Sequence, residues 1–318
     1  MTHREPRITL LSATALGGVA LLAFAACTST GTATPTTAPS TAASSHASGA
    51  ATGASPSAHA AGLPRPDHVV VVIEENHSYS DVIGNSSASY INSLAARGAS
   101  FSSSFAITHP SEPNYLALFA GTTEDLSDDS CPHTFTGANL ASELLAAGDT
   151  FTGYSESMPS DGYTGCTAGD YARKHAPWVN FTNVPAADSR TFAAFPRDFT
   201  MLPTVAVVVP NLADDMHNGT VAQGDAWLRA NLDAYARWAP AHNSELIVTW
   251  DEDDNGANNQ IPTLIVGANV KPGTYGEKIS HYSVLRTLEG FYGLPYAGSS
   301  STAAPTTDIF GPGSPTAS

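Results

Sequence analysis

Short, uninterrupted runs of β-branched and aliphatic residues recur along this chain, each about the length of one buried strand. The clearest runs occupy residues 69–73, 204–209, 245–250 and 261–266, and weaker strand patterns occur at 101–107 and 150–154. Runs of this kind are typical of strands that are covered on both faces of a parallel sheet. Helical patterns lie between them, at 89–97, 113–120, 138–147, 223–238 and 281–291. The alternation predicts an α/β fold in three layers, α/β/α, with a mostly parallel central sheet.

The first part of the chain differs in composition from its middle. Residues 1–26 carry two arginines, then an apolar run, then small residues, which predicts a secretory signal. The stretch Leu22-Ala-Phe-Ala-Ala-Cys27 is similar to a lipoprotein cleavage box with Cys27 as the acylated residue, although ordinary cleavage after Ala23 and Ala25 stays open. We therefore expect an extracellular protein, or one on the outer face of the membrane, whose membrane link is a lipid anchor at Cys27.

Low-complexity segments flank the middle of the chain. Residues 27–62 are almost entirely Thr, Ala, Ser, Gly and Pro, which predicts a disordered tether because such a segment buries too little apolar surface to offset its ordering entropy. Residues 299–318 have a similar composition and are expected to form a disordered tail. Residues 63–298 then remain as one domain with a full hydrophobic core.

The chain is acidic and poor in cysteine. Its formal net charge is -16, with only 13 Lys and Arg residues, which argues against a nucleic-acid partner. An anionic substrate would need a local source of positive charge, and a bound metal ion is the simplest one. With Cys27 assigned to the anchor, Cys131 and Cys166 are left as a pair in an exported protein, which predicts one disulfide.

The stretch from His109 to Gly121 combines a rigid turn with an apolar helix. Pro110 and Pro113 stiffen the backbone on either side of Ser111, and Pro113 suits the first turn of a helix. Ser111 is therefore expected at or just before a helix N-terminus, where free N–H groups and the helix dipole favour an anion. Taken alone, the stretch is explained by a serine that only caps the helix.

Polar clusters directly follow three of the predicted strands. They are Glu74-Glu75-Asn76, Asp214-Asp215-Met216-His217 and Asp251-Glu252. One such cluster is usually a solvated loop, but three at the carboxyl edge of one sheet favour a ligand site. Carboxylate, amide and imidazole groups together suit a divalent ion such as Zn, Mn, Fe or Ca. His281, at the start of the last predicted helix, is open to three readings: a metal ligand, a phosphate contact or an ordinary polar residue.

Several motifs, in this order, resemble the bacterial phosphoesterase family of acid phosphatases and phospholipases C, within the alkaline-phosphatase-like superfamily. The segments that carry the resemblance are 75–79, 111–115, 210–217, 224–228 and 250–253, with weaker similarity at 171–177 and 281–286. The resemblance spans about Asp67 to Pro295 and implies an alkaline-phosphatase-like fold.

The resemblance also implies roles for individual residues. Ser111 would be the nucleophile and Asn114 a contact of the phosphoryl group, because Ser-x-Pro-Asn is similar to the Thr-x-Pro-Asn of nucleotide pyrophosphatases. The implied metal ligands are Glu75, Asn76, Asp251 and Glu252, with Asp215 and His217 as further ligands or phosphate contacts, and with His175 and His281 as substrate-binding residues. The wider superfamily usually has Asp at the first strand end and Asp-His at the later one, so a single metal ion is also compatible with this chain.

We therefore expect a secreted or lipid-anchored, metal-dependent phosphoesterase, foremost an acid phosphatase that hydrolyses small phosphate monoesters through a phosphoserine. His217 or His281 would protonate the leaving alcohol. Three alternatives stay open. The aromatic-rich segment 155–200 could serve a phospholipase C or another phosphodiesterase. A metal-independent serine esterase lacks the expected Gly-x-Ser-x-Gly motif. A tethered, non-enzymatic solute-binding lipoprotein would leave Ser-Glu-Pro-Asn unexplained.

Overall fold

The computed structural model describes residues 63–311. The predicted signal segment, the tether, Cys27 and residues 312–318 lie outside the described residues. Within the described part of the chain, none of the helices has both the length and the apolar character that a membrane span requires.

The core of the fold is an eight-stranded sheet with the order β11-β2-β10-β9-β1-β8-β4-β7. Its strands are β1 (His68–Glu74), β2 (Ala99–Phe101), β4 (Phe151–Ser155), β7 (Ser189–Thr191), β8 (Val205–Val209), β9 (Ser244–Trp250), β10 (Thr263–Gly267) and β11 (Gly273–Tyr275). Strand β1 is parallel to both neighbours, with Val71 opposite Val207 and Ile247. The predicted, mostly parallel sheet is therefore confirmed, with β10 running antiparallel to β9 and to β2.

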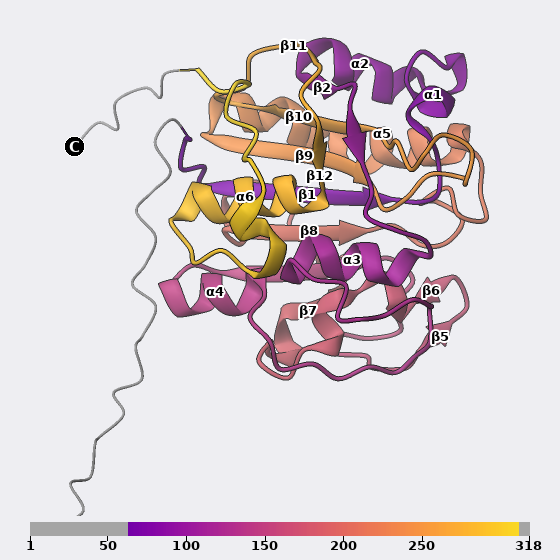
Figure 1. Ribbon diagram of the computed structural model, residues 1–318, viewed down its shortest axis with the longest axis vertical. Coiled ribbons are helices and arrows are strands. Elements are labelled where there is room, and N and C mark those ends of the chain that lie inside the picture. Colours follow the sequence, from indigo (N-terminus) through magenta and orange to yellow (C-terminus); the bar gives the residue numbers. More distant parts are fainter. Residues whose placement is uncertain (1–62, 312–318) are drawn as a thin grey trace, which may run out of the picture. The chain divides into compact units, whose positions relative to one another are not determined.

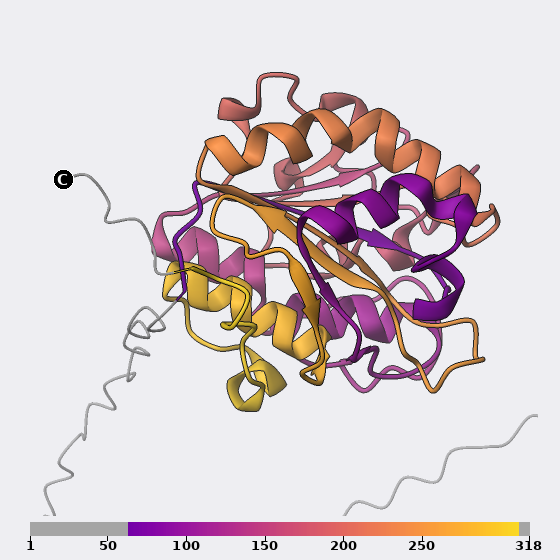
Figure 2. The same cartoon turned by 90° about the horizontal axis from the view of Figure 1, so that it is seen from above.

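Helices cover both faces of this sheet and make the three predicted layers (Figures 1 and 2). One face packs against α3 (Ser111–Ala120), α4 (Leu140–Ala147) and α6 (His281–Tyr292), and the other against α1 (Tyr79–Val82), α2 (Ser89–Arg97) and α5 (Val221–Trp238). Alternate residues of a strand point to opposite faces, so Val71 of β1 joins the first core cluster and Val72 joins the second. Burial on both faces explains why the run 69–73 is apolar throughout.

Short elements complete the described fold. Two-stranded sheets pair β3 (Ser104–Phe105) with β12 (Ile279–Ser280) and β5 (Thr167–Ala168) with β6 (Tyr171–Ala172). The 3-10 turns are η1 (Ser86–Ala88), η2 (Arg173–His175), η3 (Pro177–Asn180), η4 (Ala186–Asp188), η5 (Phe192–Ala194), η6 (Phe199–Met201), η7 (Ala239–Ala241) and η8 (Gly298–Thr302). Most of the predicted irregular segment 155–200 is thus built from tight turns rather than from long elements. The predicted disulfide is present, with Cys131 and Cys166 Sγ atoms 2.13 Å apart.

The prediction of a disordered tail from residue 299 is wrong for residues 299–311. Ile309 and Phe310 are buried in the core cluster that contains α6. The Phe310 ring packs 5.4 Å from the Phe291 ring, and the Lys271 N–H donates to the Ile309 carbonyl at 2.7 Å. Two buried apolar residues are enough to fix this segment to the domain, although most of its other residues are small or polar. The overall composition of the segment gives no sign of these two contacts.

Glu289 on α6 gives the fold a measurable pH dependence. Its buried carboxyl accepts the Ala297 N–H at 2.8 Å and the Ser300 hydroxyl at 2.6 Å. Burial raises the pKa of Glu289 to about 8, whereas the unfolded value is about 4.3. The folded chain therefore keeps a proton that the unfolded chain releases, and the contribution of Glu289 to stability falls as pH rises between these values.

We expect the free energy of unfolding of Glu289→Gln to fall less steeply with rising pH than that of the wild-type protein. Linkage gives the wild-type protein a decline on the order of 3–5 kcal/mol in the free energy of unfolding from this one group between about pH 4 and about pH 8. Urea denaturation at about pH 5 and about pH 8 measures it. The variant should gain relative to wild type at the higher pH, whereas Asp308→Asn, at an exposed site, should leave the slope unchanged. An equal slope in wild type and Glu289→Gln would contradict the raised pKa.

Candidate active site

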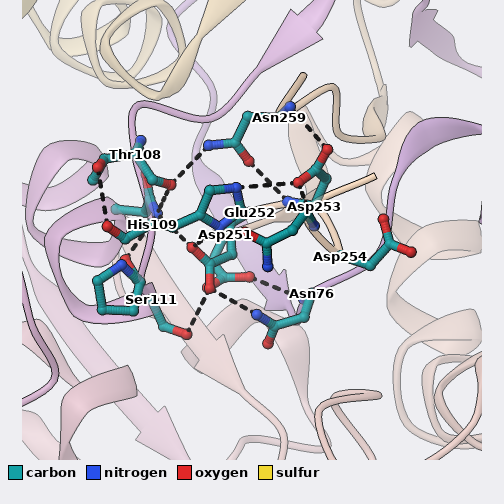
Figure 3. Close-up of polar contacts among 12 residues, drawn as sticks. Asn76, Thr108, His109, Ser111, Asp251, Glu252, Asp253, Asp254 and Asn259 are labelled. Atoms are coloured by element: carbon teal, nitrogen blue, oxygen red, sulfur yellow. Dashed lines mark hydrogen bonds and ion pairs between the residues drawn. The ribbon is translucent and has the colours of Figure 1, made fainter. Parts of the chain in front are cut away.

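The carboxyl ends of β1 and β9 bring acidic residues to the N-terminus of α3 (Figure 3). The Ser111 Oγ lies 3.2 Å from Glu75 Oε2 and 3.3 Å from Glu252 Oε1. The Asn76 Nδ2 donates to Glu252 Oε1 at 2.7 Å, and the Asn76 N–H donates to Asp251 Oδ1 at 3.1 Å. A serine hydroxyl and side chains from segments up to 176 residues apart thus meet at one point.

The turn before α3 presents the Ser111 hydroxyl. Ser111 is the first residue of α3, and Pro110 occupies the N-cap position, so Ser111 is not itself the cap. Asn114 holds the turn in place: its Oδ1 accepts the N–H groups of Ile107 and Thr108, each at 3.0 Å, and its Nδ2 donates to the Thr108 carbonyl at 2.8 Å. The Asn114 Nδ2 also lies 3.4 Å from Glu252 Oε2. In this structure Asn114 supports, from inside, the turn that presents Ser111.

A second group of donors lies on the other side of Glu75. Glu75, His175 and Asp215 are all buried, and one ligand atom from each lies within 4.8 Å of the others. The His175 Nε2 is 3.1 Å from Glu75 Oε1, and its Nδ1 is 3.4 Å from Asp215 Oδ2. The Tyr115 hydroxyl donates to Glu75 Oε1, and the Tyr115 ring stacks on His175 with centroids 5.0 Å apart.

The electrostatics of the site favour a bound cation. Burial, reinforced by the charges of Asp251 and Asp215, raises the pKa of Glu75 well above its ordinary value. Burial and the neighbouring Glu252 do the same for the pKa of Asp251. Burial also lowers the pKa of His175, which keeps its imidazole neutral and able to ligate. Carboxylates so close together in a dry site repel one another unless a positive ion neutralises them.

Among residues 63–311, several buried polar atoms of the site have no partner with hydrogen-bond geometry, including two that lie at ion-pair distance from a neighbour. They are Asn76 Oδ1, His175 Nε2, Asp215 Oδ2 and Asp251 Oδ2. Buried polar atoms are nearly always paired, so unpaired lone pairs that gather in one place call for a ligand. Three of these atoms are hard oxygen donors and one is an imidazole nitrogen, which fits a divalent metal ion. The donors of the site therefore pass the chemical test for such an ion.

The other predicted histidines lie at the edges of the site. His281 begins α6, and its Nε2 donates to the Asp251 carbonyl at 2.6 Å. Burial lowers the pKa of His281 to about 4, so its ring is neutral. His217 is exposed: its N–H donates to Asp215 Oδ1 at 2.8 Å, and its ring centroid lies 6.0 Å from that of His175. His281 thus supports the backbone of the site, whereas His217 stands at its rim.

Sequence reasoning missed His109 and Tyr115 and did not propose His175 as a metal ligand. The His109 Nδ1 lies 2.7 Å from Glu252 Oε2, and its Nε2 lies 3.2 Å from Asp253 Oδ1. The position of His109, two residues before Ser111, was the sequence feature that could have indicated its place in the site. His175 follows no predicted strand, so nothing in the pattern tied it to Glu75.

Solved structures of low sequence similarity share this fold. A protein in the alkaline phosphatase superfamily from Vibrio parahaemolyticus has a TM-score of 0.53 at 13% identity, covering 78% of this chain and 72% of that chain. The lipoteichoic acid synthase LtaP from Listeria monocytogenes has a TM-score of 0.51 at 9% identity, covering 73% of each chain. The predicted alkaline-phosphatase-like fold is therefore confirmed.

Sequence relatives are phosphatases. The phosphatidylinositol-3-phosphatase of Mycobacterium tuberculosis is 58% identical over 79% of this chain and 85% of its own. A probable acid phosphatase of Kluyveromyces lactis is 30% identical over 72% of this chain, and an acid phosphatase of Aspergillus fumigatus is 28% identical over 70%. The chain spans little more than half of these fungal relatives, 58% and 54%. The model of the Phosphoesterase family matches residues 85–295. The chain thus belongs to the Phosphoesterase family and is a hydrolase that acts on phosphate esters.

Proposed function

We propose that this protein is a metal-dependent phosphomonoesterase that works through a phosphoserine on Ser111. The observation that carries the proposal is the position of the Ser111 hydroxyl, 3.2 Å and 3.3 Å from two buried carboxylates at the strand ends. A hydroxyl in such a place is an activated nucleophile when a general base and a cation adjoin it. The names of the relatives, acid phosphatases and a phosphatidylinositol phosphatase, support the monoester class.

The proposed metal ligands are grouped around Glu75, which is itself one of them. They are Glu75, Asn76, Asp251 and Glu252 on one side, with Asp215 and His175 on the other. When bound, the ion supplies the positive charge that lowers the pKa of the serine hydroxyl and offsets the charge of the phosphate. This donor set is compatible with Zn, Mn, Fe or Ca.

The residues of the chain then account for the two chemical steps. The Ser111 Oγ attacks phosphorus, and the bond between phosphorus and the leaving alcohol breaks as the bond to Oγ forms. Glu75 Oε2, at 3.2 Å, accepts the hydroxyl proton. His217, at the exposed rim, donates a proton to the alcohol. Water then attacks the phosphoserine, and the bond between phosphorus and Ser111 Oγ breaks as the bond to water forms. Oγ takes back the proton held by Glu75 and phosphate leaves, while Asn114 holds the turn that carries Ser111 throughout.

A substrate panel tests the proposed class. We expect turnover of p-nitrophenyl phosphate to exceed that of bis(p-nitrophenyl) phosphate and p-nitrophenylphosphorylcholine by about 10²-fold in kcat/KM. Elemental analysis of the same preparation should find a divalent metal. Faster hydrolysis of either diester would identify a phosphodiesterase or phospholipase C instead, and chelator-resistant hydrolysis of carboxylic esters would identify a serine esterase.

We further propose that the protein is exported and tethered through Cys27. The signal-like composition of residues 1–26 and the Cys131–Cys166 disulfide support export, because disulfides persist in oxidising compartments. Labelling with a radioactive fatty acid tests the anchor. Label on the wild-type protein and its loss in Cys27→Ala are expected, and an unlabelled wild-type protein would contradict the anchor.

A further inference from the structure

Two cationic residues precede His175 on η2, and they are used in opposite ways. Each nitrogen of the Arg173 guanidinium donates within the protein: Nε to Asn180 Oδ1 at 2.9 Å, Nη1 to the Thr164 carbonyl at 2.7 Å and Nη2 to the His133 carbonyl at 3.0 Å. Arg173 is therefore a structural brace. Within the described part of the chain, the Lys174 ammonium pairs with one carboxylate, Asp129 Oδ2, at 2.8 Å. An ammonium group has three N–H donors, so this ion pair leaves donors for a further anion.

Asp129 ties Lys174 to the helix of the nucleophile. Its Oδ2 accepts from Lys174, and its Oδ1 accepts the N–H of Glu112 at 2.9 Å. Glu112 directly follows Ser111 on α3. One carboxylate thus holds the ammonium group beside the first turn of α3, where N–H groups and the helix dipole also attract an anion.

A disulfide and a backbone hydrogen bond connect the segment that carries Asp129 to the segment that carries Lys174. Cys131, two residues after Asp129, is bonded to Cys166, and the Cys166 carbonyl accepts the Arg173 N–H at 2.9 Å. The ion pair is still partly open, with 19% of the Lys174 side chain and 28% of the Asp129 side chain exposed.

We propose that Lys174 binds the phosphoryl group of the substrate and favours dianionic monoesters over monoanionic diesters, with Asp129 as the residue that positions it. This inference rests on the proposed monoesterase function. A monoester carries one more negative charge on its phosphoryl oxygens than a diester does, so an added cation stabilises it more. In a chain with a net charge of -16, an ammonium group tied through Asp129 to the first turn of α3 offsets part of the negative potential that a phosphate dianion meets.

The test compares kcat/KM for p-nitrophenyl phosphate and bis(p-nitrophenyl) phosphate in the full-length enzyme. Lys174→Gln should lower the monoester value by about 10²-fold and the diester value by less than about threefold. Lys174→Arg should keep the monoester value within about tenfold of wild type because it keeps the charge. Asp129→Asn should shift the ratio in the same direction as Lys174→Gln. Lys271→Gln is the matched control, because Lys271 is exposed and its Nζ contacts only the Asp308 carbonyl, at 3.4 Å, among the described residues.

Two further readouts separate this role from a structural one. Lys174→Gln should weaken inhibition by inorganic phosphate about as much as it weakens monoester turnover, with unchanged metal content and thermal midpoint. If Lys174→Gln loses equal activity on both substrates, or loses none on either, the role of Lys174 is overturned. In that case a wild-type enzyme that prefers the monoester still supports the proposed function. A wild-type enzyme that prefers the diester would overturn both.

Discussion

Replacing Ser111 by alanine is expected to lower kcat for phosphate monoesters by at least about 10⁴-fold. In the proposed scheme the hydroxyl forms the bond to phosphorus, and water in its place lacks the orientation that α3 gives to Ser111. The loss should appear in kcat rather than in KM, because the proposed metal site and Lys174 still bind the substrate. A steady-state assay with p-nitrophenyl phosphate measures it.

The control for Ser111→Ala is Ser102→Ala. Ser102 has a hydroxyl that donates to the Tyr275 carbonyl at 3.1 Å, outside the acidic cluster, and its loss should leave kcat unchanged. Metal content and thermal midpoint of Ser111→Ala should match those of wild type. If Ser111→Ala keeps a tenth or more of the wild-type rate, water attacks the substrate directly and the phosphoserine scheme fails.

Removal of the metal ion should cost at least about 10³-fold in turnover. Without the ion, a phosphate dianion must approach the buried carboxyl groups of Glu75, Asp215, Asp251 and Glu252, and the single positive charge of Lys174 does not balance four carboxyl groups. Dialysis against a chelator followed by assay measures the loss, and adding back Zn, Mn, Fe(II) or Ca one at a time identifies the ion that restores activity.

A pair of matched variants assigns the metal to this place. Glu75→Gln keeps the size of the side chain but removes its charge, and it should weaken metal affinity by about 10–100-fold or more. Glu143→Gln changes a buried glutamate of α4 outside the proposed ligand set and should leave metal affinity unchanged. Full activity in a preparation shown by elemental analysis to hold no metal would contradict the metal-dependent account.

Much of the fold could be predicted because burial leaves a clear pattern in the sequence. The run 69–73 is apolar on both faces since helices cover both faces of β1. Gly121 and Gly148 end α3 and α4 in the left-handed conformation, with φ of 69° and 84°, as their places in the sequence suggest. The antiparallel direction of β10 could not be predicted, because an apolar run has the same appearance in either direction.

The site was predictable where it follows the sheet. Glu75 and Asp251 directly follow the neighbouring parallel strands β1 and β9, so topology alone places them together. Contacts made by loops have no such signal: Asp129 reaches the first turn of α3 across 17 residues, and Tyr115 meets His175 only because η2 folds back over α3. The small and polar residues that dominate 299–318 likewise gave no indication that Ile309 and Phe310 are buried.

The stereochemistry at phosphorus tests the central claim most directly. Transfer through Ser111 requires two in-line displacements, each of which inverts the phosphorus centre, so the released phosphate should retain the configuration of the substrate. The measurement uses a monoester made chiral at phosphorus with oxygen isotopes, and analysis of the phosphate product by nuclear magnetic resonance. Retention is the result expected of a phosphoserine enzyme. Net inversion would show a single direct attack by water and would contradict the role given to Ser111.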